Sequence, residues 1–334
     1  MKAMVLAAGL GTRLQPLTFE VPKPMVPVLD RPVMAHIVRL LERQDFDELV
    51  ANVHWFPDTI RDYFGDRIEY RHEPELLGTA GGVRAVRDFF GDEEVVVLSG
   101  DALTDLDVGA LLERHRSAGG IATLTVKSIP DTRAYGVVVH DEDGRVQGFQ
   151  EKPEAEEALS DLANCGIYCF SPEIFDFFPD EDPVDWAADV FPALLEHDVP
   201  FYVHEVEAYW NDIGSLAELR QGTWDALEGR LQIEVPGREV RDGLRVGEGT
   251  ELPDDLELVD GHGWIGEDCE LGEGVRLMGQ VAIGDRCTVG SGASLRDVIL
   301  FPGTHVPAGE VVVGATVGRA ELVESLRPLD RPPG

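Results

Sequence analysis

The chain has 334 residues, enough for one large domain and a smaller one, and 43% of them are hydrophobic, which excludes a globally disordered protein. Its 63 acidic and 28 basic residues give a formal net charge of −35. An acidic surface repels phosphate backbones and anionic lipids, so we expect no nucleic-acid partner and no membrane partner.

The N-terminus and the cysteines indicate a protein of the reducing cytoplasm. The apolar run Met1–Ala8 is too short for a signal peptide and breaks at a glycine-rich loop, and no run of about 18 apolar residues occurs. The four cysteines form no C-x-x-C pair, so we expect structural thiols rather than a disulfide or a zinc site. They are Cys165, Cys169, Cys269 and Cys287.

The first 230 or so residues alternate short apolar runs with amphipathic stretches, which predicts a mainly parallel sheet with helices on both faces. The first strands are expected at Lys2–Ala8, Leu49–Val53, Ile68–Arg71 and Val95–Ser99, and the first helices at Val33–Arg43, Asp58–Phe64 and Ala80–Phe89. Closely spaced strands follow at Ile121–Lys127, Tyr135–His140, Arg145–Glu151 and Ala163–Phe170, then helices at Trp186–Leu195 and Leu216–Leu227.

After about residue 231 the helical periodicity disappears and glycine becomes frequent. Aliphatic residues then recur at every sixth position, which predicts a short left-handed parallel β-helix of about three or four coils. They are Ile265, Leu271, Leu277, Ile283, Val289 and Leu295, with Val246, Leu252 and Leu258 one residue out of phase. We therefore expect a first domain over residues 1–231, a hexapeptide-repeat domain over 232–318 and a C-terminal tail over 319–334.

Two segments near the N-terminus could bind phosphate. The loop Gly9–Leu14 follows the first strand, where glycines let backbone N–H groups approach an anion and Arg13 adds a cation. It is neither a dinucleotide fingerprint nor a P-loop, and alone it could be a plain turn. In Pro22-Lys23-Pro24 the prolines restrict the backbone and could aim the ammonium group, although a solvated loop lysine is the simpler alternative.

Further candidates lie at strand ends and helix starts. The small residues of Leu77–Gly82 could accommodate a flat base, with Thr79 as a helix N-cap. Asp101 follows an apolar strand and Asp212 precedes a glycine, so each could hold a metal or merely cap a helix. Three more polar segments could line a sugar pocket or be ordinary turns: Tyr135-Gly136-Val137, Glu151-Lys152-Pro153 and Asn164-Cys165-Gly166.

In this order the motifs resemble the signature of the sugar-phosphate nucleotidyltransferases over about residues 1–230, and a hexapeptide domain is common in that family. The resemblance implies a Rossmann-like mixed-sheet α/β domain that joins a nucleoside triphosphate to a sugar 1-phosphate and releases pyrophosphate. Four segments are most similar to mannose-1-phosphate guanylyltransferases, which favours GTP and mannose 1-phosphate. They are Val53–Asp58, Arg61–Phe64, Ser99–Asp105 and Glu207–Trp210.

The resemblance also implies roles for individual residues. Arg13, Lys23, Asp101 and Asp212 would be catalytic, and the two aspartates would hold Mg²⁺. The nucleotide would contact Leu6, Ala8, Gly9, Gly11, Thr12, Arg13, Gly78, Thr79, Ala80 and Gly81. The sugar phosphate would contact Gly136, Glu151, Lys152, Asn164 and Gly166.

Other functions stay open at this point. Glucose-1-phosphate thymidylyl- and uridylyltransferases share most of these motifs, and a non-catalytic sugar-nucleotide sensor would keep the pocket. An acyltransferase site on the solenoid would need a basic histidine, for which His262 and His305 are candidates. We prefer a scaffolding role for the solenoid and expect a homo-oligomer.

Overall fold

The computed structural model describes residues 1–318 and 322–325, and these form two compact units. The first comprises Met1–Leu10, Pro22–Pro24 and Met34–Asp212, and the second comprises Gly11–Val21, Met25–Val33 and the chain from Ile213 onward. Segments of the two units therefore alternate along the sequence near the N-terminus. The predicted tail over 319–334 lies outside the described residues, apart from the strand β25 (Leu322–Ser325).

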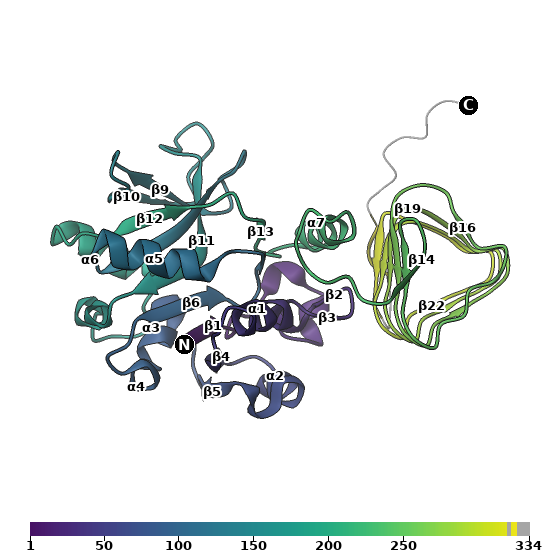
Figure 1. Ribbon diagram of the computed structural model, residues 1–334, viewed down its shortest axis with the longest axis horizontal. Helices are drawn as coiled ribbons and strands as arrows, with labels where there is room; N and C mark the ends of the chain where they lie inside the picture. The colour runs from purple at the N-terminus through teal and green to yellow at the C-terminus, as the bar shows by residue number, and fades with distance from the viewer. Residues whose placement is uncertain (319–321, 326–334) are drawn as a thin grey trace. The chain divides into compact units, whose positions relative to one another are not determined.

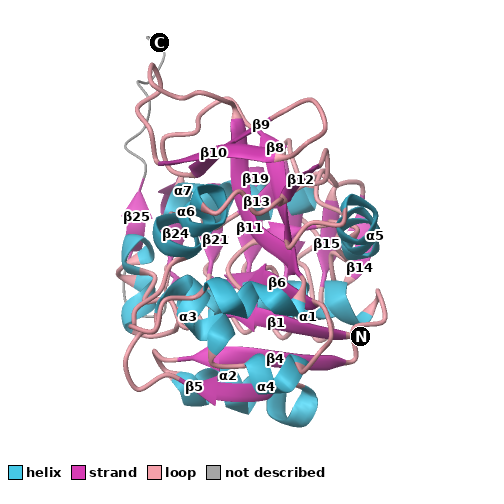
Figure 2. Cartoon of the chain, turned by 90° about the vertical axis from the view of Figure 1, so that its left-hand side faces the viewer, coloured by secondary structure: helices cyan, strands magenta, loops and turns pink. Residues whose placement is uncertain are grey.

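The first unit is built on a mixed sheet, as the family resemblance implies, whereas the alternation of strands and helices alone predicts a mainly parallel one. Its main order is β10-β9-β11-β6-β1-β4-β5, and β8 joins β11 to β12; Figure 2 shows the run from β5 to β11. β1 is parallel to β4 and β6, whereas β11 is antiparallel to β6. The strands are β1 (Lys2–Leu6), β4 (Glu48–Val53), β5 (Glu69–His72), β6 (Val95–Ser99), β8 (Ala122–Ser128), β9 (Gly136–His140), β10 (Val146–Glu151), β11 (Leu162–Phe170) and β12 (Tyr202–Glu205).

Helices cover this sheet and enclose an apolar core. α5 packs against β8, β11 and β12, while α3 contacts β1 and α6 contacts β10. The helices of this unit are α1 (Val33–Glu42), α2 (Pro57–Phe64), α3 (Gly78–Arg84), α4 (Arg87–Phe90), α5 (Val108–Ala118) and α6 (Phe191–Glu196), with a π-turn η6 (Trp186–Val190) and short 3-10 turns η3 (Lys23–Met25), η4 (Gly65–Arg67) and η5 (Pro172–Phe177).

Two helix predictions need correction, and one helix was not predicted. The single helix expected over Ala80–Phe89 is two helices, because the backbone at Val86 leaves the helical region. The helix expected from Trp186 begins as a π-turn capped by the Asp185 side chain. α5 was not predicted, because its apolar positions are interrupted by the buried His115.

The second unit contains the predicted parallel β-helix. Figure 1 shows its three-sided coils, and one wall stacks the parallel strands β15, β17, β19, β21 and β24, more coils than expected. The predicted hexad residues point into its core: five of the six have at most 1% of their surface exposed, and Leu271 is half-buried. The strands are β14 (Arg238–Arg241), β15 (Leu244–Val246), β16 (Glu257–Leu258), β17 (Gly263–Ile265), β18 (Glu270–Leu271), β19 (Arg276–Ile283), β20 (Thr288–Val289), β21 (Ser294–Leu300), β22 (His305–Val306), β23 (Val311–Val313) and β24 (Ala315–Val317).

The same unit holds the helix α7 (Leu216–Leu227), the hairpin β2 (Pro27–Val28) and β3 (Arg31–Pro32), and the turns η1 (Thr12–Leu14) and η2 (Leu17–Phe19). α7 contacts β19 and β2. The Arg220 guanidinium donates to the Gly314 carbonyl at 2.6 Å, and Gln280 donates to Glu228 at 2.6 Å. These bonds attach the helix to the solenoid.

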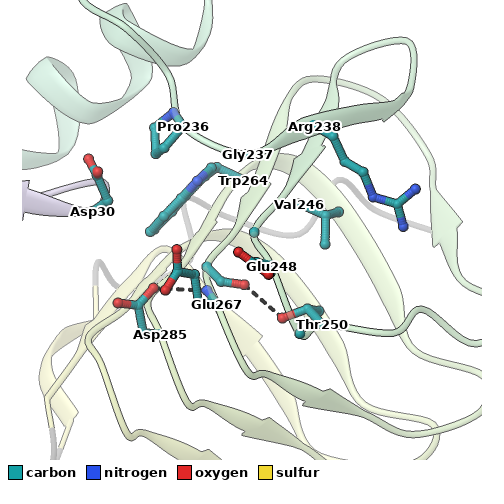
Figure 3. Close-up of a pocket in the computed structure, with 13 residues that line it drawn as sticks. Asp30, Pro236, Gly237, Arg238, Val246, Glu248, Thr250, Trp264, Glu267 and Asp285 are labelled. Carbon is teal, nitrogen blue, oxygen red and sulfur yellow. Dashed lines mark hydrogen bonds between the residues drawn. The ribbon is translucent and has the colours of Figure 1, made fainter.

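Trp264 is an outward side chain of the solenoid that is nevertheless buried. Trp264 on β17 is 2% exposed and borders an acidic pocket of about 600 Å³. Figure 3 shows its ring between Pro236 and the carboxylates of Glu267 and Asp285. The hexapeptide pattern does not predict a tryptophan at this position, and Pro236 and Gly237 from the segment before β14 line the same pocket.

All four cysteines are buried free thiols, as expected. Burial raises the pKa of Cys165 and of Cys169, which keeps both thiols protonated and unreactive. Among the residues that the structure describes, no helix has the length and apolar character needed to cross a membrane.

Candidate active site

Lys23, Asp101 and Asp212 meet at one point of the first unit. The Lys23 ammonium lies 2.5 Å from Asp101 Oδ2, and it donates to the backbone carbonyl of Asp212 at 3.0 Å. Lys23 is 8% exposed, so its charge is largely removed from water. A lysine framed by two prolines thus joins two aspartates that lie far apart in the sequence.

Asp101 is placed by the close approach of β6 to β1. The Gly100 N–H donates to the Leu6 carbonyl at 2.9 Å, and a Cβ at position 100 would lie 2.8 Å from that same oxygen. Glycine is therefore required here, because any side chain would push the two strand ends apart. The Ser99 hydroxyl donates to Asp101 Oδ1 and fixes the carboxylate from the other side.

A two-stranded ladder brings the two aspartates together. β7 (Leu103–Thr104) follows Asp101 and pairs with β13 (Trp210–Asn211), which precedes Asp212. The Thr104 hydroxyl donates to the Tyr209 carbonyl at 2.7 Å, and the Tyr209 N–H donates to an Asp105 carboxylate oxygen at 2.7 Å. The sequence did not predict these strands, because two-residue strands leave no periodic pattern.

The predicted sugar-side residues lie on neighbouring strands of the same unit. Glu151 at the end of β10 pairs with Gly136 at the start of β9, and a Cβ on Gly136 would lie 2.5 Å from the Phe149 ring. Lys152 forms an ion pair with Glu151 at 2.6 Å, and both side chains are about half exposed. An amine and a carboxylate are therefore available to a ligand from solvent.

Asn164 and Gly166 lie where β11 bulges. The Asn164 amide donates to the Tyr168 hydroxyl at 2.8 Å and accepts the Gly166 N–H at 3.2 Å. Gly166 has φ +69°, and a Cβ there would be 3.5 Å from the Ser99 Cβ. The sugar-side bulge is thus a direct neighbour of the serine that holds Asp101.

The predicted nucleotide-binding segments of this unit are joined by a buried pair that sequence reasoning missed. Asn52 accepts the Ala7 N–H at 2.8 Å and donates to Glu73 Oε1 at 2.8 Å, and Glu73 Oε2 accepts the Leu77 N–H at 3.1 Å. Asn52 and Glu73 are 3% and 2% exposed. The pair therefore fixes the end of β1 relative to the start of α3. Its sequence signal is a polar residue within the apolar strand β4.

Three of the predicted nucleotide-binding residues lie at the end of β1 and just after it: Leu6 is half-buried, Ala8 is buried and Gly9 is exposed. In α3 the prediction of Thr79 as N-cap is wrong, because the helix starts at Gly78 and the Thr79 hydroxyl donates to Asp185 at 2.6 Å. The N–H groups of Ala80 and Gly81 both donate to the Val184 carbonyl, at 3.0 and 3.1 Å, so they are not open to a base.

Gly11, Thr12 and Arg13 belong to the second unit. Gly11 adopts the left-handed conformation (φ 63°), and its carbonyl accepts the Thr18 hydroxyl at 2.9 Å. The Arg13 guanidinium lies against Gly214, where a Cβ would be 3.1 Å from it. A side chain at position 214 would therefore crowd this guanidinium, which would have to shift by a few tenths of an ångström.

Comparisons with known proteins identify the family to which this chain belongs. The family model for nucleotidyl transferases matches residues 2–229, and the model for the bacterial transferase hexapeptide (six repeats) matches residues 262–297.

The chain belongs to the nucleotidyl transferase family.

This nucleotidyl transferase is similar to a UTP–glucose-1-phosphate uridylyltransferase of Synechocystis sp., with 37% identity over 95% of the chain and 87% of the relative. It is 31% identical to a mannose-1-phosphate guanylyltransferase of Mycobacterium tuberculosis, over 93% of the chain and 82% of the relative. A Bacillus anthracis structure solved with sucrose shares the fold, with a TM-score of 0.62 and 23% identity, covering 70% of this chain and 96% of that one.

Family membership defines the class of reaction. The protein is an enzyme, a sugar-1-phosphate nucleotidyltransferase. In this structure the buried Lys23 ammonium contacts the Asp101 carboxylate and the backbone carbonyl of Asp212.

Proposed function

We propose that this nucleotidyl transferase makes UDP-glucose and pyrophosphate from UTP and glucose 1-phosphate. The observation that carries the choice of substrates is the 37% identity to the Synechocystis uridylyltransferase over nearly the whole chain. This proposal replaces the sequence-based preference for GTP and mannose 1-phosphate. GDP-mannose synthesis remains the second candidate, favoured by 31% identity to the Mycobacterium tuberculosis guanylyltransferase.

We propose Mg²⁺ as the metal cofactor, held by Asp101 and Asp212. The donor set fits, because Mg²⁺ prefers oxygen ligands and is usually bound by one or two carboxylates together with substrate phosphates. Within the described part of the chain, no cluster of three or more His, Cys, Asp or Glu side chains could hold a metal alone. This accords with a site completed by the nucleotide. When bound, the ion would supply positive charge to the triphosphate.

Charge counting explains the cations of the site. A triphosphate carries roughly −4 and a sugar phosphate about −2, and like charges about 4 Å apart repel by about 4 kcal/mol per pair at an effective dielectric of 20. Lys23 would offset charge near the α-phosphate, and Lys152 would hold the sugar phosphate. Arg13 and the N–H groups of Gly9 and Gly11 would bind the triphosphate.

The reaction needs positioning more than proton transfer. An oxygen of the sugar phosphate attacks the α-phosphorus, the bond from that phosphorus to the bridging oxygen breaks, and pyrophosphate leaves with the electron pair. The attacking oxygen is already anionic, so no general base is required. Lys23 and Lys152 therefore act by orienting the two substrates in line and by stabilising the charge of the transition state.

A substrate matrix tests the proposal. ATP, GTP, UTP, CTP and dTTP are each incubated with glucose, mannose and galactose 1-phosphates and Mg²⁺, and pyrophosphate is measured. We expect UTP with glucose 1-phosphate to give the highest kcat/KM. A higher value for GTP with mannose 1-phosphate would select the second candidate, and no release with any pair would contradict both.

A further inference from the structure

One corner of the β-helix carries a buried hydroxyl or thiol in successive coils. The backbone joins these positions into a ladder, because the N–H at or just after each one donates to a group of a neighbouring rung. At most 5% of each side chain is exposed. The rungs are Thr250, Cys269, Cys287 and Thr304.

The threonine rungs show what this corner needs from a side chain. The Thr250 hydroxyl donates to the Gly266 carbonyl at 2.7 Å. The Cys269 thiol makes the corresponding contact with the Gly284 carbonyl, where sulfur and oxygen lie 3.1 Å apart. A hydroxyl already satisfies the carbonyl of the corner, so this hydrogen bond does not explain why thiols occupy the two middle rungs.

The two thiols lie in adjacent coils and in register. Each directly precedes a strand of the same parallel ladder, in which Glu270 of β18 is paired with Thr288 of β20. The Glu270 N–H donates to the Cys287 carbonyl at 2.9 Å. Neighbouring strands are about 4.8 Å apart, and a disulfide joins Cα atoms that are about 4.4–6.8 Å apart. The spacing of the coils therefore suits a disulfide between Cys269 and Cys287.

The two sulfur atoms are within hydrogen-bonding distance of each other and differ in acidity. A hydrogen bond from the Cys287 thiol lowers the pKa of Cys269 to about 7. The same hydrogen bond, together with burial, raises the pKa of Cys287. Because the thiolate is the reactive form of cysteine, Cys269 is the sulfur that an oxidant attacks first, and a protonated thiol lies beside it.

We propose that Cys269 and Cys287 form a redox-sensitive pair, which a peroxide converts into a disulfide that joins two coils of the β-helix. The Cys269 thiolate attacks one peroxide oxygen, the O–O bond breaks and hydroxide leaves, which gives a sulfenic acid on Cys269. The Cys287 sulfur then bonds to the Cys269 sulfur, the S–O bond breaks, and the hydroxyl group leaves as water with the Cys287 proton. Two thiols are thereby oxidised and the peroxide is reduced.

The test maps the cysteines of the folded wild-type protein after treatment with hydrogen peroxide. Free thiols are alkylated in denaturant, and the peptides are analysed by mass spectrometry without reduction. We expect a pair of peptides linked through Cys269 and Cys287, lighter by two hydrogen atoms than the separate peptides, which dithiothreitol separates. Cys165 and Cys169 are internal controls, because burial raises the pKa of each and both should stay free for alkylation.

Two variants separate the roles of the thiols. Cys269→Thr and Cys287→Thr introduce the residue that the outer rungs already carry, so both should fold. After peroxide treatment, Cys269→Thr should keep a reduced Cys287. Cys287→Thr should accumulate sulfinic acid at Cys269, because no neighbouring thiol captures the sulfenic acid.

The wild-type map decides the proposal even where a variant is unstable. Complete alkylation of Cys269 and Cys287, while free glutathione in the same sample is oxidised, would overturn it. Sulfinic acid at Cys269 without the linked peptides would also overturn it, because Cys287 would then not act as the partner thiol. A disulfide that includes Cys165 or Cys169 instead would refute the selectivity for the ladder.

Discussion

Replacing Lys23 by methionine tests the electrostatic role of the central cation. The substitution keeps most of the side-chain length and removes a charge that is 8% exposed and paired with Asp101 at 2.5 Å. A unit charge about 4 Å from a phosphate oxygen contributes about 4 kcal/mol at an effective dielectric of 20, and each 1.4 kcal/mol is about tenfold in rate. Because solvent and the metal share the phosphate charge, we expect kcat to fall by about 10²- to 10³-fold.

The assay is continuous detection of pyrophosphate at saturating UTP, glucose 1-phosphate and Mg²⁺. The control is Lys2→Met at the start of β1, where the ammonium pairs with Glu93 at 2.6 Å and has no part in the site. Lys2→Met should keep wild-type kcat. Loss of the bond to Asp101 costs about 1–3 kcal/mol of stability. Circular dichroism and the Tm are therefore measured to establish that Lys23→Met is folded. A folded Lys23→Met with a kcat within threefold of wild type would refute the reasoning.

Four other perturbations have defined outcomes. Asn52→Leu removes the hydrogen-bond partner of the Ala7 N–H and of Glu73. The free energy of unfolding in urea should therefore fall by about 1–3 kcal/mol, and the KM for the triphosphate should rise. An unchanged KM would contradict a role of Asn52 in placing the predicted nucleotide-binding segments. Trp264→Ala should lower the free energy of unfolding by about 3–5 kcal/mol in calorimetry, and a loss below about 1 kcal/mol would show that the buried ring contributes little to stability. Raising the KCl concentration from 0.1 M to 1 M shortens the Debye length from about 10 Å to about 3 Å. The Tm should rise, because the salt screens the repulsion among the charges of a chain whose formal net charge is −35. A Tm that does not change with KCl would argue against net repulsion. Burial lowers the pKa of His115 below 6.5, so the unfolded state takes up a proton first and the stability of the protein falls as the pH drops below 6.5. His115→Gln should reduce this loss of stability, measured by urea unfolding between pH 7 and pH 5. An identical dependence of stability on pH in the variant would contradict this role of His115.

The parts of the fold with a regular period were predictable. The six-residue spacing of aliphatic residues located the solenoid core, because each coil needs inward side chains at fixed intervals. The strand Val95–Ser99 and the helix Leu216–Leu227 were predicted at their observed bounds. Long apolar runs and clear helix boundaries carry their own local signal, which explains these successes.

The parts that depend on distant contacts were not predictable. The ladder between β7 and β13 spans two residues on each side, and nothing local indicates that they pair. The hydrogen bond from Asn52 to Glu73 joins residues 21 positions apart in the sequence. The hydrogen bonds from the N–H groups of α3 to the Val184 carbonyl join residues that are still further apart. Lys23 and Asp101 were proposed as site residues because of their type and their flanking residues, but only the fold shows that the two side chains are in contact.

The most direct test of the central account is pyrophosphate release by Asp101→Asn and Asp212→Asn. Each change keeps the shape of the side chain and removes a carboxylate that we assign to the metal. The account predicts folded proteins in which Mg²⁺-dependent release from UTP and glucose 1-phosphate is abolished. Turnover at the wild-type rate by either variant would contradict it.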